Sequence, residues 1–365
     1  QGGTDTQALS ITVVNGNEFP DAINLVGGVV PESSANGTLV GTAVGHDPDP
    51  GDVLTYAFVP GFDAGGRFAI NATTGDITVL DGSRLDYETN NSHLVVVRTT
   101  DPYGLFLDRA FTITVANVDE PPVITSGGGG PTAAVSVQEN ITSIMSVAAT
   151  DPEGLPITYS IIGGADAALF TINAATGALA FVTGQDRENP LDANGDNVYD
   201  VIVQASDGAL FDQQTIFVTI TNVNEPPVIT SNGGGPGATV FVAENSTAVT
   251  TMTATDPDPA TILTYSIIGG ADAAKFTING ATGALAFASA PNFEAPTDIG
   301  ADNVYDVIVQ VSDGSLTDAQ AIAVTVTNQN EPPTITSPLA GATIAENTTS
   351  VATVTATDPD AGTVF

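Results

Sequence analysis

The sequence of 365 residues contains no cysteine, no tryptophan, two histidines and only six basic residues. Without cysteine the chain forms no disulfide bonds and no thiolate metal sites. The single lysine, Lys275, lies in the last third of the chain, so Lys–Asn isopeptide crosslinks cannot staple the parts before it. No apolar run reaches 18 residues, which excludes a membrane-spanning helix in this segment. Stability must therefore come from hydrophobic cores and from bound metal.

The charge is strongly one-sided, with 42 acidic residues and a formal net charge of −36. Binding to nucleic acid or to anionic lipid needs clustered Lys and Arg, so both are excluded. Acidic chains are often disordered, but the hydrophobic content of 42% and the strand patterning argue against disorder here. The remaining explanation is that bound divalent cations neutralise much of the charge.

A six-residue segment recurs along the chain as Asn-Val-Asp-Glu-Pro-Pro, Asn-Val-Asn-Glu-Pro-Pro and Asn-Gln-Asn-Glu-Pro-Pro, starting at residues 117, 222 and 328. The spacings are 222 − 117 = 105 and 328 − 222 = 106 residues. This period predicts a tandem array with complete repeats at 19–120, 121–225 and 226–331.

The remaining residues at both ends belong to incomplete repeats. Residues 1–18 resemble the tail strand of a preceding repeat, and residues 332–365 resemble the start of a further one. The chain is then either a window from a longer array or a protomer whose partial ends complete each other head to tail.

Apolar residues alternate with polar ones throughout, as in Tyr305, Val307, Val309 and Val311. This period of two is typical of half-buried antiparallel strands, and turn signals follow about every ten residues. We expect an all-β fold of tandem seven-stranded Greek-key β-sandwiches, immunoglobulin-like in architecture and arranged as a linear rod. The glycine runs at 127–130 and 233–235 predict either a kink where the first strand switches sheets or a hinge.

Five acidic stations recur in a fixed order within each repeat. They are a glutamate after the first strand, an Asp-Pro loop such as Asp256-Pro257-Asp258, a mid-repeat motif such as Asp186-Arg187-Glu188, a late aspartate, and the Asn-x-Asx-Glu-Pro-Pro junction. Opposite poles of neighbouring sandwiches would bring these stations together at each joint. Carboxylate, amide and carbonyl oxygens without Cys or His favour Ca²⁺ over softer metals.

This order of motifs resembles cadherin repeats, and in particular the bacterial cadherin-like repeats of large surface proteins. The resemblance implies calcium bound between successive sandwiches. It assigns to the first joint Glu32, Asp86, Glu88, Asn117, Asp119, Glu120, Asp151, Glu153 and Asp207. It assigns to the second joint Glu139, Asp186, Glu188, Asn222, Asn224, Glu225, Asp256, Asp258 and Asp313. It assigns to the third joint Glu244, Glu294, Asn328, Asn330, Glu331, Asp358 and Asp360.

The chain departs from the family pattern at two points. Glu-Pro-Pro replaces the usual Asp-Asn of the junction, and Asn292 replaces the mid-repeat aspartate of the third joint. We therefore expect the third joint to be the weakest. The absence of tryptophan means that the strand-swap adhesion of animal cadherins is not implied.

Other polar residues leave alternatives open. Asp192, Asn194 and Asp196 have the spacing of an EF-hand-like loop, but Val203 stands where the twelfth-position glutamate belongs, so an ordinary hydrogen-bonded turn is the alternative. We expect His46 to order the Asp-Pro loop and His93 to be a surface strand residue. Glycan attachment or a simple turn role would explain Asn71, Asn140, Asn245 and Asn347.

These features predict a non-enzymatic, extracellular protein. The histidine and cysteine content leaves no nucleophilic triad or zinc site in the second and third repeats. We expect a calcium-rigidified repeat array that forms the stalk of a large bacterial surface adhesin. The alternative is a protomer of a self-assembling filament, sheath or surface layer. The expected partners are calcium ions, with copies of the chain itself or another surface protein as further candidates.

Overall fold

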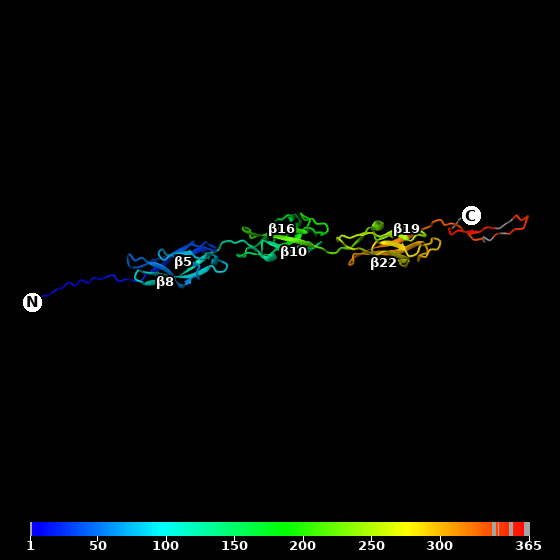
Figure 1. Cartoon of the computed structure of the whole chain (residues 1–365). Coiled ribbons are helices and arrows are strands. Elements are labelled where there is room, and N and C mark those ends of the chain that lie inside the picture. Colours follow the sequence, from blue (N-terminus) through cyan, green and yellow to red (C-terminus); the bar gives the residue numbers. More distant parts are fainter. Residues whose placement is uncertain (1, 338–340, 342, 350–352, 361–365) are drawn as a thin grey trace. The chain divides into compact units, whose positions relative to one another are not determined.

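The structure is a computed structural model that describes residues 2–337, 341, 343–349 and 353–360 (Figure 1). The chain divides into two compact units. One unit comprises Gln1–Val135, Thr142–Val182 and Tyr199–Val218, and the other comprises Ser136–Ile141, Thr183–Val198 and Thr219–Phe365. The boundary passes through the middle one of three β-sandwiches, whose long strands continue from one unit into the other.

The first sandwich consists of two four-stranded sheets, ordered β1-β3-β6-β5 and β2-β8-β7-β4. Its elements are β1 (Ala22–Gly27), β2 (Val29–Pro31), β3 (Leu39–His46), β4 (Thr55–Asp63), β5 (Phe68–Ile70), β6 (Asp76–Val79), η1 (Gly82–Arg84), β7 (Ser92–Thr100) and β8 (Phe106–Ala116). Strand β1 is antiparallel to β3, whereas β2 is parallel to β8. The first strand therefore changes sheets at Gly27 and Gly28, which both have positive φ.

The second sandwich repeats this plan with sheets β10-β17-β16-β13, β11-β15-β14 and β9-β12. Its elements are β9 (Val123–Ile124), η2 (Ser126–Gly128), β10 (Thr132–Gln138), β11 (Ser143–Ser146), β12 (Ala149–Thr150), β13 (Thr158–Gly163), η3 (Ala167–Leu169), β14 (Phe170–Ile172), β15 (Ala178–Phe181), β16 (Val198–Ser206) and β17 (Phe211–Thr221).

The third sandwich has the same order, in sheets β19-β26-β25-β22, β20-β24-β23 and β18-β21. Its elements are β18 (Val228–Ile229), η4 (Ser231–Gly233), β19 (Gly237–Ala243), β20 (Ala248–Thr251), β21 (Ala254–Thr255), β22 (Thr264–Gly269), η5 (Ala273–Lys275), β23 (Phe276–Ile278), β24 (Ala284–Phe287), β25 (Val304–Ser312) and β26 (Thr317–Thr327).

Counting each interrupted strand once gives seven strands per sandwich, so the predicted all-β fold of tandem seven-stranded β-sandwiches is confirmed. The glycine runs mark the switch of the first strand between sheets. In the second sandwich β9 pairs with β12 before the run, and β10 lies beside β17 after it. The kink is therefore the correct interpretation of residues 127–130 and 233–235.

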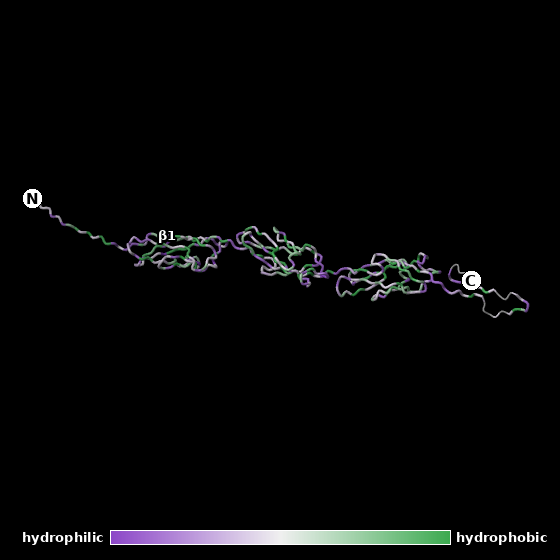
Figure 2. Tube along the Cα trace, turned by 90° about the horizontal axis from the view of Figure 1, so that it is seen from above, coloured by the Kyte–Doolittle hydropathy of each residue, from purple (hydrophilic) through white to green (hydrophobic). Residues whose placement is uncertain are grey.

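The predicted alternation fills the cores. Tyr305, Val307, Val309 and Val311 of β25 are all at most 1% exposed and pack with Ile322, Val324 and Val326 of β26. Apolar stretches of the chain trace run through the three sandwiches, whereas the segments between them are hydrophilic (Figure 2). Burying these side chains is the main source of stability in a chain without covalent staples.

The described residues outside the three sandwiches contain little regular structure. No strand forms over residues 2–21, where the tail strand of a preceding repeat was expected at 1–18, and Leu9, Ile11 and Val13 are 84%, 77% and 88% exposed. A strand needs a sheet neighbour for its backbone groups, and none of the described residues supplies one. Beyond the third sandwich, β27 (Thr334–Ile335) pairs with β28 (Ala356–Thr357). Within the described residues, no helix is long and apolar enough to cross a membrane.

Gly177 provides a test of how tightly the hairpins pack. It has φ of +67°, and a Cβ there would lie 2.1 Å from the carbonyl oxygen of Val147. We expect Gly177→Ala to destabilise the second sandwich by about 3 kcal/mol, because the backbone must move and the conformation is strained. Urea unfolding would measure this. Gly130→Ala is the control, since a Cβ there has no neighbour nearer than 4.0 Å and its φ is ordinary. Equal effects of the two changes would contradict the prediction.

Candidate metal centres

A buried glutamate follows the first strand of each sandwich. Glu32, Glu139 and Glu244 come directly after β2, β10 and β19 and are only 2–3% exposed. Each carboxylate accepts two backbone N–H bonds, one from the mid-repeat motif and one from the junction. The donors and distances are Tyr87 at 2.8 Å and Val118 at 2.7 Å for the first, Arg187 at 3.0 Å and Val223 at 2.6 Å for the second, and Phe293 and Gln329 at 2.8 Å for the third.

Further glutamates gather around each of these carboxylates. In every group the members each offer an oxygen, and these oxygens lie within 4.8 Å of one another. The groups are Glu32, Glu88, Glu120 and Glu153; Glu139, Glu188 and Glu225; and Glu244, Glu294 and Glu331. Each group lies inside one compact unit, so its geometry belongs to that unit.

Many of the gathered oxygens are shielded from solvent and have no hydrogen-bond donor. Among the described residues, the carboxylates with such oxygens are Asp47, Asp52, Asp151, Glu153, Glu188, Asp207, Glu225, Asp256, Glu294 and Glu331. In Glu153, Glu188 and Glu294 both oxygens are in this condition. Shielded carboxylate oxygens are normally paired, so their clustering fits a cation-binding site. A donor set made only of oxygens, most of them charged, has the chemistry that Ca²⁺ prefers.

The protein alone does not stabilise these charges. Burial, followed by the charge of Glu139, raises the pKa of Glu188 to about 7. Burial is also the main cause that raises the pKa values of Glu88, Glu120, Glu225 and Glu331, and neighbouring carboxylates add to it. Desolvation and like charges both favour the protonated form. The groups therefore resist full ionisation unless a cation is added.

The Asp-Pro loops hold the junction backbone. In the third sandwich Asp256 accepts a 2.9 Å bond from the N–H of Asp258, and Asp258 accepts a 2.8 Å bond from the N–H of Glu225. Asp358 and Asp360 repeat both bonds with the N–H of Glu331. At the first joint Glu153 occupies the position that Asp258 and Asp360 have in the later loops. Its carboxylate belongs to the glutamate group rather than binding the junction N–H.

Several predicted ligands have other bonds. Asp86, Asp186 and Asn292 lie outside the glutamate groups and accept backbone N–H bonds from Thr89, from Glu188 and Asn189, and from Ala295. Asp207 and Asp313 close their own turns through the N–H groups of Leu210 and Leu316. The side chains of Asn222 and Asn224 donate to Asp258 and Asp313, and Asn330 donates to the carbonyl of Glu331. Within the described residues, the side chains of Asn117, Asp119 and Asn328 form no hydrogen bond.

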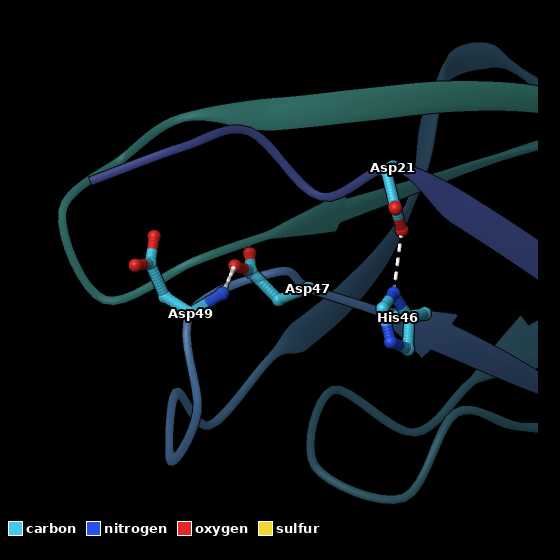
Figure 3. Close-up of polar contacts among 4 residues, drawn as sticks. All are labelled: Asp21, His46, Asp47 and Asp49. Carbon is cyan, nitrogen blue, oxygen red and sulfur yellow. Dashed lines mark hydrogen bonds and ion pairs between the residues drawn. The ribbon is translucent and has the colours of Figure 1, made fainter. Parts of the chain in front are cut away.

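A fourth acidic group, missed by the sequence prediction, lies at the start of the first sandwich. Oxygens of Asp47, Asp49 and Asp52 lie within 4.8 Å of one another, beside a hollow of about 220 Å³. Asp49 accepts from the side chain of Asn15 and from the N–H of Glu18, and Figure 3 shows its own N–H donating to Asp47 at 2.9 Å. The similarity of residues 15–18 to the later junctions could have indicated this acidic group from the sequence. No sequence motif pointed to Asp52.

Two asparagines that follow the strand glutamates were also missed as site residues. Asn140 and Asn245 have φ of 63° and 59° and donate to Glu225 at 3.5 Å and to Glu331 at 2.9 Å. Their conformation supports the turn role rather than requiring a glycan. Asn71 likewise accepts the N–H groups of Thr73 and Thr74 in a turn.

The loop from Asp192 is an ordinary hydrogen-bonded turn. Asp192 accepts the N–H groups of Asp196 and Asn197 at 2.8 and 3.3 Å, and Asp196 accepts that of Val198 at 2.8 Å. The equivalent Asp298 accepts the N–H groups of Asp302 and Asn303 at 3.0 and 3.2 Å. Backbone donors thus account for these carboxylates without a cation.

The predicted loop role of His46 and the predicted surface position of His93 were wrong, whereas the strand predicted around His93 is β7. His46 pairs with Asp21 through a 2.6 Å contact between exposed side chains and leaves the Asp-Pro loop free (Figure 3). His93 in β7 is only 5% exposed, with its ring 6.0 Å from that of Phe68. Burial and then the charge of Arg67 lower the pKa of His93, which favours the neutral ring.

Comparison with known proteins gives consistent matches. The model of the cadherin domain matches residues 28–116 and 238–328. The mouse protein Cadherin EGF LAG seven-pass G-type receptor 2 is 28% identical over 302 residues, which cover 79% of the chain and 10% of the relative. Human Protocadherin Fat 1 is 28% identical over 371 residues, which cover 94% of the chain and 8% of the relative. The chain thus spans about a tenth of the length of these curated relatives.

Solved structures share the fold. The crystal structure of human CDH23 EC21-23 has a TM-score of 0.58 and 20% identity, covering 84% of this chain and all of that one. The Protocadherin gammaB7 EC3-6 cis-dimer structure has a TM-score of 0.57 and 21% identity, covering 84% of this chain and 77% of that one. At this identity the likeness concerns the tandem β-sandwich architecture alone.

The two bonds of the strand glutamate can be tested by Glu139→Gln. A glutamine offers one acceptor oxygen, so one of the N–H groups of Arg187 and Val223 loses its partner. We expect a loss of about 1–3 kcal/mol in unfolding free energy, with chelator as well as with calcium. Thermal unfolding would measure it. Glu346→Gln is the matched control, because Glu346 has the same place in its repeat but is exposed. No loss in chelator would contradict the structural role.

The raised pKa of Glu188 predicts how stability depends on pH. The folded pKa of about 7 exceeds the ordinary 4.5, so between these values the folded state retains a proton that the unfolded state has released. Without metal, this contribution is complete below pH 4.5 and is lost as pH rises through 7. We expect the metal-free melting temperature to fall from pH 5.5 to pH 8, and Glu188→Gln to flatten the fall. A rise over this range in chelator would refute the prediction.

Proposed function

Because the chain is built of cadherin repeats, which are extracellular adhesion-type domains, we propose that it is a calcium-binding structural array outside the cell. In this proposal Ca²⁺ links successive sandwiches and limits the bending of the joints. The repeats run over 19–120, 121–225 and 226–331, flanked by parts of further repeats at 1–18 and 332–365. The array is the stalk of a large bacterial surface adhesin and carries no catalytic activity.

One observation carries the proposal: solvent-shielded carboxylate oxygens without donors are concentrated at the stations that the sequence assigns to the joints. Glu188 and Glu225 illustrate it, since three of their four oxygens are shielded and unpaired. Bound Ca²⁺ would supply the positive charge that offsets their desolvation and mutual repulsion. Arg187, the nearest basic residue in the sequence, donates its side chain to Asn222.

The residues have distinct tasks in this proposal. Strand glutamates such as Glu139 order the backbone of both the mid-repeat motif and the junction. The mid-repeat and junction glutamates, such as Glu188 and Glu225, present oxygens to the ion. The Asp-Pro loop of the following sandwich, through Asp256 and Asp258, supplies further oxygens and holds the junction N–H. The ion therefore takes ligands from both sides of the junction.

The second candidate is a protomer of a self-assembling extracellular filament, sheath or surface layer. The alternating apolar residues Leu9, Ile11 and Val13 are exposed in the described structure, and a sheet edge of another copy would cover them. Copies of the chain are the partners in this case, and another surface protein is the partner in the stalk. Both candidates use the same calcium joints.

Calcium removal tests the proposal. We expect chelator to lower the melting temperature and to broaden the distribution of dimensions in small-angle scattering. A ligand at 100 times its Kd adds about 2.7 kcal/mol per independent site to the unfolding free energy. Unchanged melting and unchanged scattering after chelation would refute the proposal.

A variant pair locates the site. Glu188→Gln combined with Glu225→Gln should weaken calcium binding at the second joint at least tenfold in calorimetry, because two charged ligands are lost. Asp302→Asn is the matched control, since Asp302 lies outside the glutamate groups and accepts the N–H of Val304 at 3.0 Å within a local turn. Equal losses in both proteins would show a general charge effect instead of a site.

A further inference from the structure

A histidine occupies a core position of the first sandwich. His93 of β7 is 5% exposed and corresponds in position to Tyr199 of β16 and Tyr305 of β25, since 199 − 93 and 305 − 199 both give 106. The centroid of its imidazole lies 6.0 Å from that of the Phe68 ring, in an edge-on arrangement. The ring centroids of Tyr305 and Phe276 lie 6.5 Å apart in the same arrangement. The first sandwich thus buries a group that titrates near neutral pH, where the other two bury a phenol.

The surroundings of the two ring nitrogens suit the neutral form. The side-chain oxygen of Asn90 accepts the N–H of Ser92 at 3.2 Å, so the amide nitrogen of Asn90 faces Nδ1 of His93, 3.4 Å away. In this arrangement Nδ1 is the acceptor and the proton lies on Nε2. Nε2 is shielded from solvent and has no hydrogen-bond partner among the described residues. A second proton would place a donor against a donor at Nδ1, and neither N–H of the imidazolium would have an acceptor.

Positive charge lies close to the imidazole. Burial is the main cause that lowers the pKa of His93, and the charge of Arg67, directly before β5, is the second. The guanidinium of Arg67 is held by the carbonyl oxygens of Ala64 and Arg84 at 2.9 and 3.0 Å. Arg84 in turn donates to the carbonyl of Gly65 at 2.7 Å, so both guanidinium groups are fixed to the same loop. A proton on the ring would therefore add a further positive charge in a place with little solvent.

The neighbouring segments offer no negative charge to compensate. Asp63 accepts the N–H of Gly65 at 3.1 Å, and Asp81 accepts the hydroxyl of Ser83 at 2.6 Å. On β8 the residue opposite the histidine is the uncharged Ile113. No carboxylate oxygen of a described residue lies within 4.0 Å of an imidazole nitrogen of His93. The folded sandwich therefore has no group that would stabilise the imidazolium.

This environment links the stability of the first sandwich to pH. The ordinary pKa of the imidazole is 6.5, and the folded value is lower. Below pH 6.5 the unfolded chain therefore binds a proton at this ring that the folded chain does not. The contribution of the neutral ring to stability is complete above pH 6.5 and is lost as the pH falls toward the folded pKa. A difference of one proton changes the folding equilibrium constant by about tenfold per pH unit.

We propose that His93 is a proton switch: uptake of a proton by its ring favours opening of the first sandwich, whereas the second and third sandwiches lack this response. Strand β7 lies between β8 and β4 in its sheet, so a change at β7 affects the whole sheet. The segment before β7 carries Glu88, a member of the first glutamate group, and opening would release that group as well. The switch uses proton uptake within one sandwich and is independent of calcium at the joints.

Amide hydrogen exchange on the full chain in saturating calcium tests the switch, because it reports the opening of each sandwich separately. The amides of Val95 and Val97 in β7 report on the first sandwich, and those of Val201 and Val203 in β16 report on the second. After correction for the pH dependence of the chemical exchange rate, the protection of the β7 amides should fall about tenfold from pH 7.5 to pH 5.5. The β16 amides should show no such fall.

Two variants remove the titrating ring. His93→Tyr introduces the residue of the other two sandwiches, and His93→Leu introduces a smaller side chain in case the phenol is too large. Both should abolish the fall in β7 protection, and because the ratio between two pH values is measured, a general loss of stability does not obscure the result. His46→Gln is the matched control, since the exposed His46 lies outside the core and its removal should leave the fall unchanged. A fall that persists in both His93 variants, that is equal in β7 and β16, or that is absent from the unaltered chain would overturn the proposal.

Discussion

The two hydrogen bonds accepted by each buried strand glutamate are the interaction on which the joints depend. Glu32, Glu139 and Glu244 each tie a mid-repeat turn and a junction to the end of a strand, three segments that are distant in sequence. A buried carboxylate with two backbone donors is satisfied without metal, so its role is first structural. The other glutamates, such as Glu188 and Glu294, are oriented by this frame but lack donors of their own. The frame and the proposed ion therefore use different carboxylates of one group.

This division explains why so acidic a chain folds with so few basic residues. Ion pairs with Lys or Arg would fix the joints permanently, whereas in the proposed function carboxylates that share a divalent cation would form a joint whose stiffness follows the calcium concentration. Desolvation raises the pKa of Glu188, and the same desolvation strengthens its attraction to a cation. The cost of gathering the charges in the absence of metal is limited, because a proton can replace the ion. The apolar cores of the first and third sandwiches supply a part of the stability that does not depend on this exchange.

The sequence was sufficient for the fold because its strong signals are local or periodic. Alternation identified β25 and β26, and the recurring junction set the repeat length. Residues whose role depends on distant partners were harder to predict. His93 shares the inward phase of Val95 and Val97, but its polar type suggested the surface; the neutral ring packs on Phe68 instead. His46 contacts Asp21 because β1 pairs with β3, and this pairing could not be read from the sequence around His46. An aspartate can either bind a metal ion or cap a turn, so the sequence did not decide the role of Asp86 and Asp186. The structure shows that both cap turns.

The same distinction changes how the joints compare with one another. Asn292 removes a charge from the third joint, which led us to expect the weakest site there. Its side chain caps a turn as Asp86 and Asp186 do, so the lost charge lies outside the glutamate group. A larger difference occurs at the first joint, where Glu153 replaces the aspartate that elsewhere caps the junction N–H. One extra methylene carries that carboxylate into the group, which then contains four glutamates instead of three.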